Sequence, residues 1–266
     1  MAKIGFIGLG ALGAAMAERV LAQGHEVVGF NRSPEKVAAL VPLGLKPAAT
    51  AAAACDADMV ISVLLDDAAV ETVLVTDDPF GDAAATLHVS VSTISVPLVH
   101  ALARRHAAAG QAFVSAPVFG RPDAIRDASA VIAVGGAAEA IERCREVLGS
   151  CGTLANVGPD PGTANAVKMA GNFLMASAVQ SLREALLLAE AAGGDRQQFV
   201  DIVTTALFPT SFYQRFGGLL AAQGSDAPAI NPFANSARLI ARTSQELSVA
   251  APLADALADA LDRPLG

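Results

Sequence analysis

The sequence predicts an α/β fold in which a doubly wound parallel sheet is followed by an all-helical C-terminal domain, the two being joined by a long interdomain helix. Three observations support this. Strand-like apolar runs alternate with amphipathic segments over the first part of the chain, a glycine-rich turn follows the first run, and only helical patterns occur after residue 160. Two prolines and two glycines in 156–165 mark the boundary. We therefore expect domains at 1–159 and 160–266.

The strands are predicted from short Val- and Ile-rich runs: 3–10, 26–30, 59–65, 86–92, 112–118 and 128–134. Amphipathic or alanine-rich segments between them are expected to be helices: 11–23, 34–42, 48–58, 95–109 and 137–148. Continuous apolar strands separated by helices predict a parallel sheet that is covered on both faces through right-handed crossovers.

The C-terminal part is predicted to consist of helices at 161–193, 195–206, 210–222 and 235–262. Gly193 and Gly194 are expected to end the first of these helices, and Asp195 to cap the next.

Composition excludes several classes of protein. The chain has 266 residues, of which 53% are hydrophobic and 17% charged, so it is long and apolar enough for a large core. The net charge of −8 argues against nucleic acid as a partner. Charged residues interrupt the apolar run 173–189, which argues against a membrane span.

Cysteine and histidine usage predicts neither a disulfide framework nor a metal site. The three cysteines (55, 144 and 151) form no C-x-x-C pair, and the four histidines lack metal-ligand spacing. No signal peptide is expected from the first residues. These features favour a cytoplasmic protein.

The turn "GLGALG" carries the G-x-G-x-x-G pattern of a Rossmann dinucleotide site, placed after a strand and at the start of a helix. Gly8 allows the tight turn, Gly10 lets a pyrophosphate approach the backbone, and Gly13 lets the helix pack closely on the strand. The helix N-terminus then offers free N–H groups to the phosphates. The intervening residues of the predicted cofactor site are Leu9, Ala11 and Leu12.

The segment "FNRSPEK" after the second strand predicts NADP(H) rather than NAD. An NAD-selective site carries a carboxylate at this point, whereas this chain has Asn31, Arg32 and Ser33. The guanidinium can bind a 2′-phosphate bidentately, the neighbours can add neutral hydrogen bonds, and Lys36 is assigned to the same site. Alternatively, Arg32 is an ordinary exposed charge and Ser33 only caps the helix that begins at Pro34.

Lys168 is the only charged residue in the long apolar helix 161–182, and Asn172 follows one turn later. A nicotinamide enzyme needs a group that handles the proton on the carbonyl oxygen, and an ammonium group can do so. The amide can orient the lysine or hold the substrate. The alternative is a lysine whose stem lies along apolar surface while its charge reaches water.

Five motifs in this order, "GFIGLGALG", "FNRSPEK", "VSTIS", "SAPVFG" and "GTANAVKMAGN", resemble the β-hydroxyacid dehydrogenase family. That family includes 3-hydroxyisobutyrate dehydrogenases, tartronate semialdehyde reductases and glyoxylate/succinic semialdehyde reductases. The resemblance covers residues 3 to about 220. It implies a Rossmann domain, a long interdomain helix and a helical domain that usually forms a homodimer.

The resemblance also implies roles for residues at matching positions. Lys168 falls on the catalytic acid/base and Asn172 on its companion. Ser92 and Thr93 fall on the Ser-Thr pair beside the nicotinamide ribose. The residues expected against the cofactor after the third strand are Val63, Leu64 and Leu65.

Two departures from the family pattern affect the expected substrate. The substrate loop, usually Asp-x-Pro-Val-Ser-Gly-Gly, has Phe119 in place of the serine, then Gly120 and Arg121. Arg121 either replaces the lost hydroxyl as a carboxylate clamp or is simply solvated. The family's Lys-Asp pair would fall near 235–236, where this chain has Asn and Ser.

Three functions remain open. The first is an NADPH-dependent reductase of small aldehydes or ketoacids, which would also act as a 3-hydroxyacid dehydrogenase. The second is an imine reductase, a related group that typically lacks the lysine. The third is a non-enzymatic nucleotide-binding interaction protein.

Overall fold

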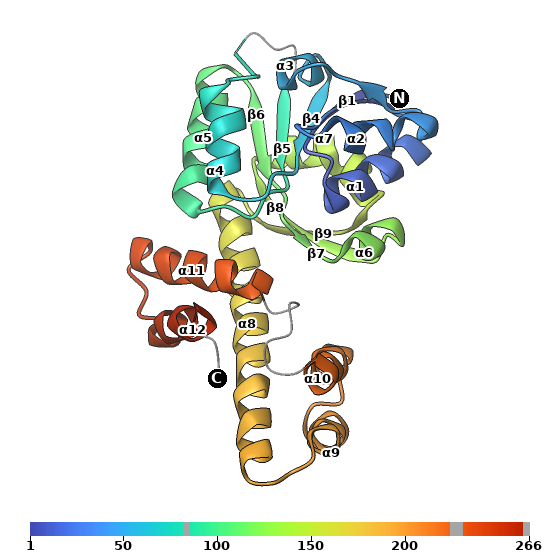
Figure 1. The fold of residues 1–266 in the computed structure, drawn as a ribbon. Helices are drawn as coiled ribbons and strands as arrows, with labels where there is room; N and C mark the ends of the chain where they lie inside the picture. The colour runs from blue at the N-terminus through green and yellow to red at the C-terminus, as the bar shows by residue number, and fades with distance from the viewer. Residues whose placement is uncertain (82–85, 224–230, 263–266) are drawn as a thin grey trace. The chain divides into compact units, whose positions relative to one another are not determined.

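A computed structural model describes residues 1–81, 86–223 and 231–262, and it confirms the predicted doubly wound sheet and helical C-terminal region (Figure 1). The chain divides into two compact units, Met1–Lys168 and Met169–Gly266. The first holds the sheet and its covering helices, and the second is built from helices.

The first unit contains one sheet with the strand order β3-β2-β1-β4-β5-β6-β8-β7, and β9 pairs with β8. The strands are β1 (Lys3–Ile7), β2 (Glu26–Phe30), β3 (Lys46–Pro47), β4 (Met59–Ser62), β5 (Leu87–Ser90), β6 (Ala112–Ser115), β7 (Val118–Phe119), β8 (Ala130–Gly136) and β9 (Gly152–Gly158). Strands β1 to β6 are parallel, and the strand order reverses between β1 and β4. A doubly wound sheet binds its cofactor outside the carboxyl ends of the strands at this switch point.

The prediction of a wholly parallel sheet is wrong at one edge. Strand β8 runs antiparallel to β6 and β7, with Ser115 opposite Gly135 and Phe119 opposite Val131. Only residues 120–129, which contain the short helix α6 (Pro122–Arg126), separate β7 from β8. A parallel return needs a crossover of a dozen residues or more, so the short connection reverses the strand. Strand β9, absent from the prediction, then pairs parallel with β8.

Helices cover both faces of the sheet (Figure 1). The helices of this unit, besides α6, are α1 (Ala11–Ala22), α2 (Pro34–Ala38), α3 (Ala51–Ala54), α4 (Asp67–Val70) with a π-helical turn (Glu71–Thr76), α5 (Val96–Ala108) and α7 (Ala138–Gly149). One hydrophobic cluster joins the strands to α1 and α7, through residues such as Met16 and Ile141. The other joins them to α3, α4 and α5, through Ala54, Val70 and Leu102.

Helix α8 (Pro161–Ala191) begins in the first unit and continues into the second. In the second unit it packs against α9 (Arg196–Ile202) and α10 (Ser211–Gln223) through buried residues such as Leu186 and Leu220. Gly193 has φ 85°, and the carboxylate of Asp195 accepts the N–H of Gln198 at 2.9 Å, which confirms the predicted helix end and cap. A π-helical turn (Val203–Leu207) extends α9.

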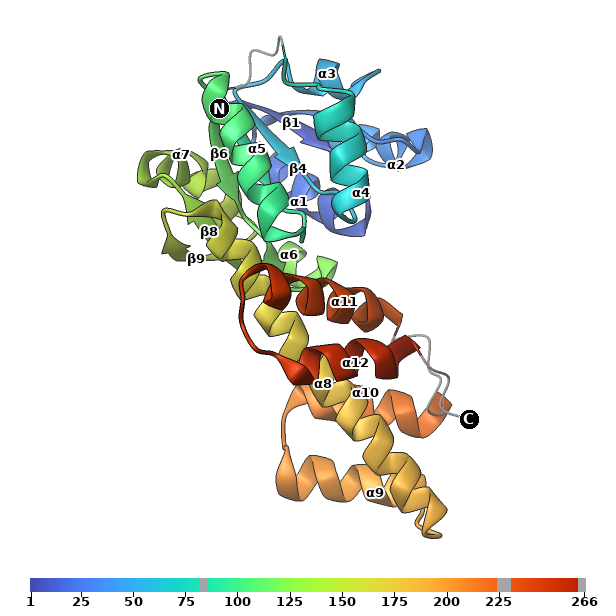
Figure 2. The same cartoon turned by 90° about the vertical axis from the view of Figure 1, so that its left-hand side faces the viewer.

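The single helix predicted at 235–262 is instead two helices, α11 (Asn231–Glu246) and α12 (Pro252–Asp262). Ser248 has φ 55°, a left-handed conformation that ends a helix, and Pro252 lacks the N–H that a continuing helix would need. The two helices lie side by side (Figure 2). Within the described ranges, no helix is long and apolar enough to cross a membrane.

Candidate active site

The glycine turn has the backbone geometry that its sequence pattern predicts. Gly8 has φ 96°, and a Cβ atom there would lie 2.2 Å from the carbonyl oxygen of Val63. A Cβ at Gly13 would lie 2.1 Å from the carbonyl oxygen of Gly8. At Gly10, by contrast, no described atom lies within 4 Å of such a Cβ. Side chains are therefore excluded sterically at the first and third glycines, while the second faces open space that a pyrophosphate can enter.

Helix α1 begins directly after this open position, at Ala11, without a side chain that caps its first N–H groups. These N–H groups and the helix dipole make a site for an anion. Leu9 is buried and Leu12 is half-buried, so the turn is anchored by apolar packing on either side of Gly10. The residues present thus fit a dinucleotide phosphate group.

Asn31 connects the glycine turn to the loop after β2. Its Oδ1 accepts the N–H of Leu9 at 2.9 Å, and its Nδ2 donates to the carbonyl of Ser33 at 3.1 Å. Arg32 and Lys36 are exposed, and Ser33 stands before α2 with its hydroxyl making no cap bond. Asn31 thus holds the loop after β2 against the glycine turn, where the phosphates would bind. Arg32 and Lys36 are the two cationic side chains on the segment that follows Asn31.

Hydrogen bonds of the residues after β4 hold the carboxyl ends of β1, β4 and β5 together. The N–H of Val63 donates to the carbonyl of Ile7 at 2.8 Å, and the N–H of Leu64 donates to the Ser92 hydroxyl at 2.9 Å. Ser92 is buried, so its hydroxyl bonds to the loop after β4 and does not face solvent. Thr93 is half-buried, and Leu65 is 86% exposed.

Lys168 lies against the ring of Phe119, with its Nζ 4.5 Å from the ring centroid. Both side chains are half-buried, and burial lowers the pKa of Lys168 from 10.5 to about 8. A group with this pKa can give up and regain a proton near neutral pH. Gly120 and Arg121, the rest of the predicted substrate loop, are exposed.

Asn165, which was not predicted as a site residue, is fully buried one turn before Lys168. Its Oδ1 accepts the N–H of Ile94 at 2.9 Å, and its Nδ2 donates to the Ser115 hydroxyl at 2.7 Å. The available signal was a lone amide three positions before the lysine in "GTANAVK".

The boundary between the two units falls between two of the predicted site residues. The first unit contains Lys168, Phe119 and the glycine turn, whereas Asn172 belongs to the second unit, half-buried and one turn further along α8. The side chains at 235–236, where the Lys-Asp pair was expected, lie outside the described residues. Among the described residues, no group of three or more His, Cys, Asp or Glu side chains could hold a metal ion.

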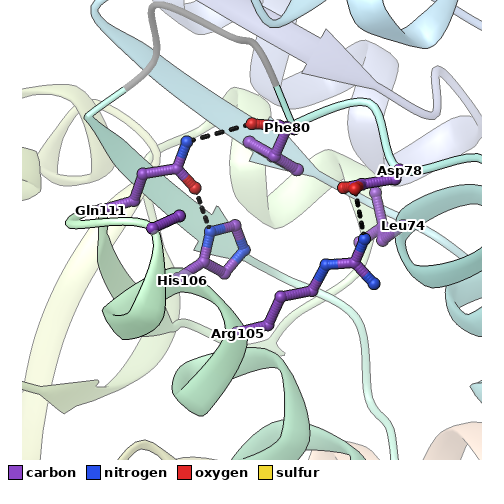
Figure 3. Close-up of a pocket in the computed structure, with 8 residues that line it drawn as sticks. Leu74, Asp78, Phe80, Arg105, His106 and Gln111 are labelled. Atoms are coloured by element: carbon purple, nitrogen blue, oxygen red, sulfur yellow. Dashed lines mark hydrogen bonds and ion pairs between the residues drawn. The ribbon is translucent and has the colours of Figure 1, made fainter.

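A small pocket lies elsewhere in the first unit, beside the amino ends of β5 and β6 (Figure 3). Arg105 forms an ion pair with Asp78 there, and Gln111 bonds to His106 and to the carbonyl of Phe80. The pocket includes none of the predicted site residues, and its arginine is already neutralised. It is therefore not the candidate active site. The complete lining is Leu74, Asp78, Phe80, Gly81, Arg105, His106, Ala109 and Gln111.

Comparison with known proteins shows which family the chain resembles. Residues 3–169 match the family described as the NAD binding domain of 6-phosphogluconate dehydrogenase. The chain is 41% identical to the uncharacterized oxidoreductase YfjR of Bacillus subtilis, over 83% of this chain and 78% of that protein. It is 30% identical to the 3-hydroxyisobutyrate dehydrogenase of Pseudomonas aeruginosa, over 100% of this chain and 89% of that protein. A solved imine reductase of Streptomyces aurantiacus is similar with a TM-score of 0.68 and 26% identity, covering 97% of this chain and 93% of that one.

Proposed function

Because the chain belongs to the β-hydroxyacid dehydrogenase family of oxidoreductases, we propose that it is an NADPH-dependent reductase of small aldehydes or ketoacids, in which Lys168 is the general acid/base. In the reverse direction it would act as a 3-hydroxyacid dehydrogenase. The observation that carries the proposal is the half-buried Lys168 ammonium, which lies against the Phe119 ring and whose pKa is lowered by burial to about 8. A structural lysine in water would keep its ordinary pKa.

The nicotinamide, when bound, supplies the hydride that reduces the carbonyl carbon. Lys168 then donates one proton to the carbonyl oxygen, which becomes a hydroxyl, and is left as a neutral amine. In the oxidation direction the neutral amine accepts that proton. Before the transfer, the ammonium also polarises the carbonyl by hydrogen bonding to its oxygen. Asn172, one turn along α8, is proposed to hold the substrate oxygen or the lysine.

NADPH is proposed as the cofactor because Arg32 occupies the position after β2 where a carboxylate would favour NAD. Its guanidinium is exposed, as is the ammonium of Lys36 one turn later, and both can bind a 2′-phosphate. The glycine turn and the N-terminus of α1 are proposed to bind the pyrophosphate.

The substrate is proposed to be bulkier or less polar than a simple β-hydroxyacid. Phe119 replaces the family's serine hydroxyl with a ring, and that ring contacts the catalytic lysine. The N–H of Gly120 and the guanidinium of Arg121 remain as candidate donors to a substrate carboxylate. We further propose a cytoplasmic homodimer.

The test is NADPH oxidation by the purified chain with a panel of semialdehydes, ketoacids and cyclic imines. Lys168→Met keeps an unbranched side chain but removes the proton donor, so we expect kcat to fall roughly 10²- to 10⁴-fold. Lys3→Met, a lysine substitution at the amino end of β1, should leave kcat unchanged. A Lys168→Met variant with full turnover of carbonyl substrates would refute the assignment.

Imine reduction is the second candidate, because the similarity to an imine reductase spans 97% of the chain and Phe119 makes the loop less polar. The same panel separates it: turnover of cyclic imines that survives Lys168→Met would favour this function. The fluorescence of bound NADPH reports cofactor binding. Binding of NADPH without turnover of any substrate would favour a non-catalytic nucleotide-binding protein.

A further inference from the structure

The side chain of Asn165 joins three segments of the first unit. Its Oδ1 accepts from the backbone N–H of Ile94, the residue directly after Thr93. Its Nδ2 donates to the hydroxyl of Ser115, where the loop toward Phe119 begins. Its own backbone belongs to α8, one turn before Lys168. The amide therefore links the loop after β5, the loop after β6 and the lysine helix.

The orientation of this amide is fixed by its partners. The N–H of Ile94 can only donate, so it must meet Oδ1, and Nδ2 must then face the oxygen of Ser115. The side chain is 0% exposed, and a buried amide that lost these bonds would be left unsatisfied. The contact thus has one favourable geometry, and rotation of α8 at this position would break both bonds.

The start of α8 does not depend on Asn165. Asp160 accepts the N–H of Gly162 at 2.8 Å and bonds to His100 Nε2 at 2.8 Å, which anchors the first turn to α5. Asn165 lies in the following turn, so its two bonds add a second attachment point. Two attachment points one turn apart define the direction in which the next turn presents Lys168.

We propose that Asn165 is a positioning residue that holds Lys168 in register with the cofactor loop at Thr93 and the substrate loop at Phe119. The inference rests on the proposed role of Lys168. It assigns to Asn165 no contact with the reacting atoms.

Two substitutions in the full-length chain test the inference. Asn165→Leu has a similar size but removes both bonds. We expect kcat to fall roughly 10- to 100-fold because the lysine is displaced, while the dissociation constant for NADPH changes less than about threefold. In Asn165→Asp, the carboxylate still accepts from Ile94 and the Ser115 hydroxyl can rotate to donate. We expect kcat within about fivefold of the unchanged chain.

The proton affinity of Lys168 provides a readout that a merely structural residue would not change. In Asn165→Leu, a displaced Lys168 should leave the Phe119 ring and regain water, so its pKa should rise from about 8 toward the ordinary value of 10.5. The pKa is measured by competitive acetylation of Lys168 at several pH values, followed by mass spectrometry. In the activity assay, the alkaline limb of the pH profile should move upward by the same amount.

Cys55→Ser is the matched control, because it disturbs a fully buried core residue directly after α3. If Asn165→Leu lowers the melting temperature like this control and keeps its kcat, the positioning role is wrong. If Asn165→Leu leaves the pKa of Lys168 in the labelling experiment unchanged, the inference also fails, and this measurement needs no substrate. Full turnover by Lys168→Met would instead refute the proposed function, so the two failures are distinguishable.

Discussion

At the scale of single residues, Phe119 and Lys168 form a pair in which two opposing effects act on one ammonium group. The ring face attracts the cation by about 0.5 to 2 kcal/mol, which favours the charged form. Burial removes water from the same cation and favours the neutral amine. Burial lowers the pKa of Lys168 to about 8, and desolvation is therefore the effect that we expect a change at Phe119 to relieve.

Replacing the ring should therefore shift the pH dependence of catalysis. Reduction requires the protonated lysine, so activity is present below the pKa of Lys168 and is lost as the pH rises through it. We expect Phe119→Ser to admit water, raise that pKa and move the alkaline limb to higher pH. A serine should also improve kcat/KM for carboxylate-bearing substrates roughly 10-fold relative to neutral aldehydes. Steady-state kinetics between pH 6 and 10 measure both effects.

Phe119→Leu is the control for this prediction, because it keeps an apolar side chain without a hydroxyl. The leucine variant should retain the preference for neutral aldehydes. Superimposable pH profiles for the unchanged chain and Phe119→Ser would contradict the shielding role of the ring.

Arg32 is expected to decide the choice between the two nicotinamide cofactors. Hydrogen bonds to charged groups are worth about 1.5 to 3 kcal/mol, so Arg32→Ala should lower the preference for NADPH over NADH by roughly 10- to 100-fold. Lys36→Ala, which removes a neighbouring cation one turn later, should have a smaller effect. Fluorescence titration with both cofactors gives the two dissociation constants. An unchanged ratio in Arg32→Ala would assign the preference to other residues.

At the scale of elements, structural features that depend on neighbouring residues could be predicted from the sequence, whereas pairings between distant segments could not. The glycine turn is local, because the steric need for Gly8 and Gly13 arises within one βα unit, and both were identified correctly. The direction of β8 depends on the short connection through α6, and periodicity does not report direction. The break between α11 and α12 was not predicted, because the amphipathic pattern continues across Pro252.

Asn165 shows the same difference at the candidate site. The lysine was found because a charge stands out in an apolar helix, whereas a polar helix residue such as asparagine is usually exposed. Its role depends on Ile94 and Ser115, which are 71 and 50 positions away in sequence. Such pairings require the packed fold.

A directional chain of hydrogen bonds connects β4, β5 and α5. Gln111 donates its Nε2 to the carbonyl of Phe80, so its Oε1 must accept from Nδ1 of His106. His106 Nε2 then accepts from His88 Nδ1 at 2.9 Å, and His88 Nε2 accepts from the Ser62 hydroxyl at 2.8 Å. This direction holds because burial lowers the pKa of each imidazole, so that both are neutral.

Because these two histidines are buried and neutral, we expect the protein to lose stability in mild acid. The unfolded histidines bind protons with a pKa near 6.5, whereas the folded ones resist protonation, so stability is complete above about pH 6.5 and falls below it. Two such groups contribute up to about 3 kcal/mol between pH 7.5 and 5.5. Urea unfolding at both pH values gives this difference. His106→Gln should remove about half of it, and equal losses in variant and unchanged chain would refute the assignment.

At the scale of the whole molecule, the two units differ in how much apolar surface they leave exposed. The first unit encloses its sheet between helices on both faces. In the second unit, large apolar side chains of α8 and of α9 with its π-helical extension are exposed, and α8 has few charges that would keep it in water. The exposed residues of these elements include Leu174, Leu188, Ile202 and Leu207, each more than 60% exposed. Exposed apolar surface of this kind marks an interaction site.

We expect a second copy of the chain to cover this surface, giving a homodimer of twice 26.8 kDa. Sedimentation equilibrium at micromolar concentration measures the mass. Leu188→Glu would place a charge in the interface and should weaken dimerisation by at least about tenfold, since burying an unpaired charge costs several kcal/mol. Leu43→Glu, on an exposed apolar residue of the first unit, should leave the mass unchanged. A mass of 26.8 kDa for the unchanged chain would show that this surface does not join two copies.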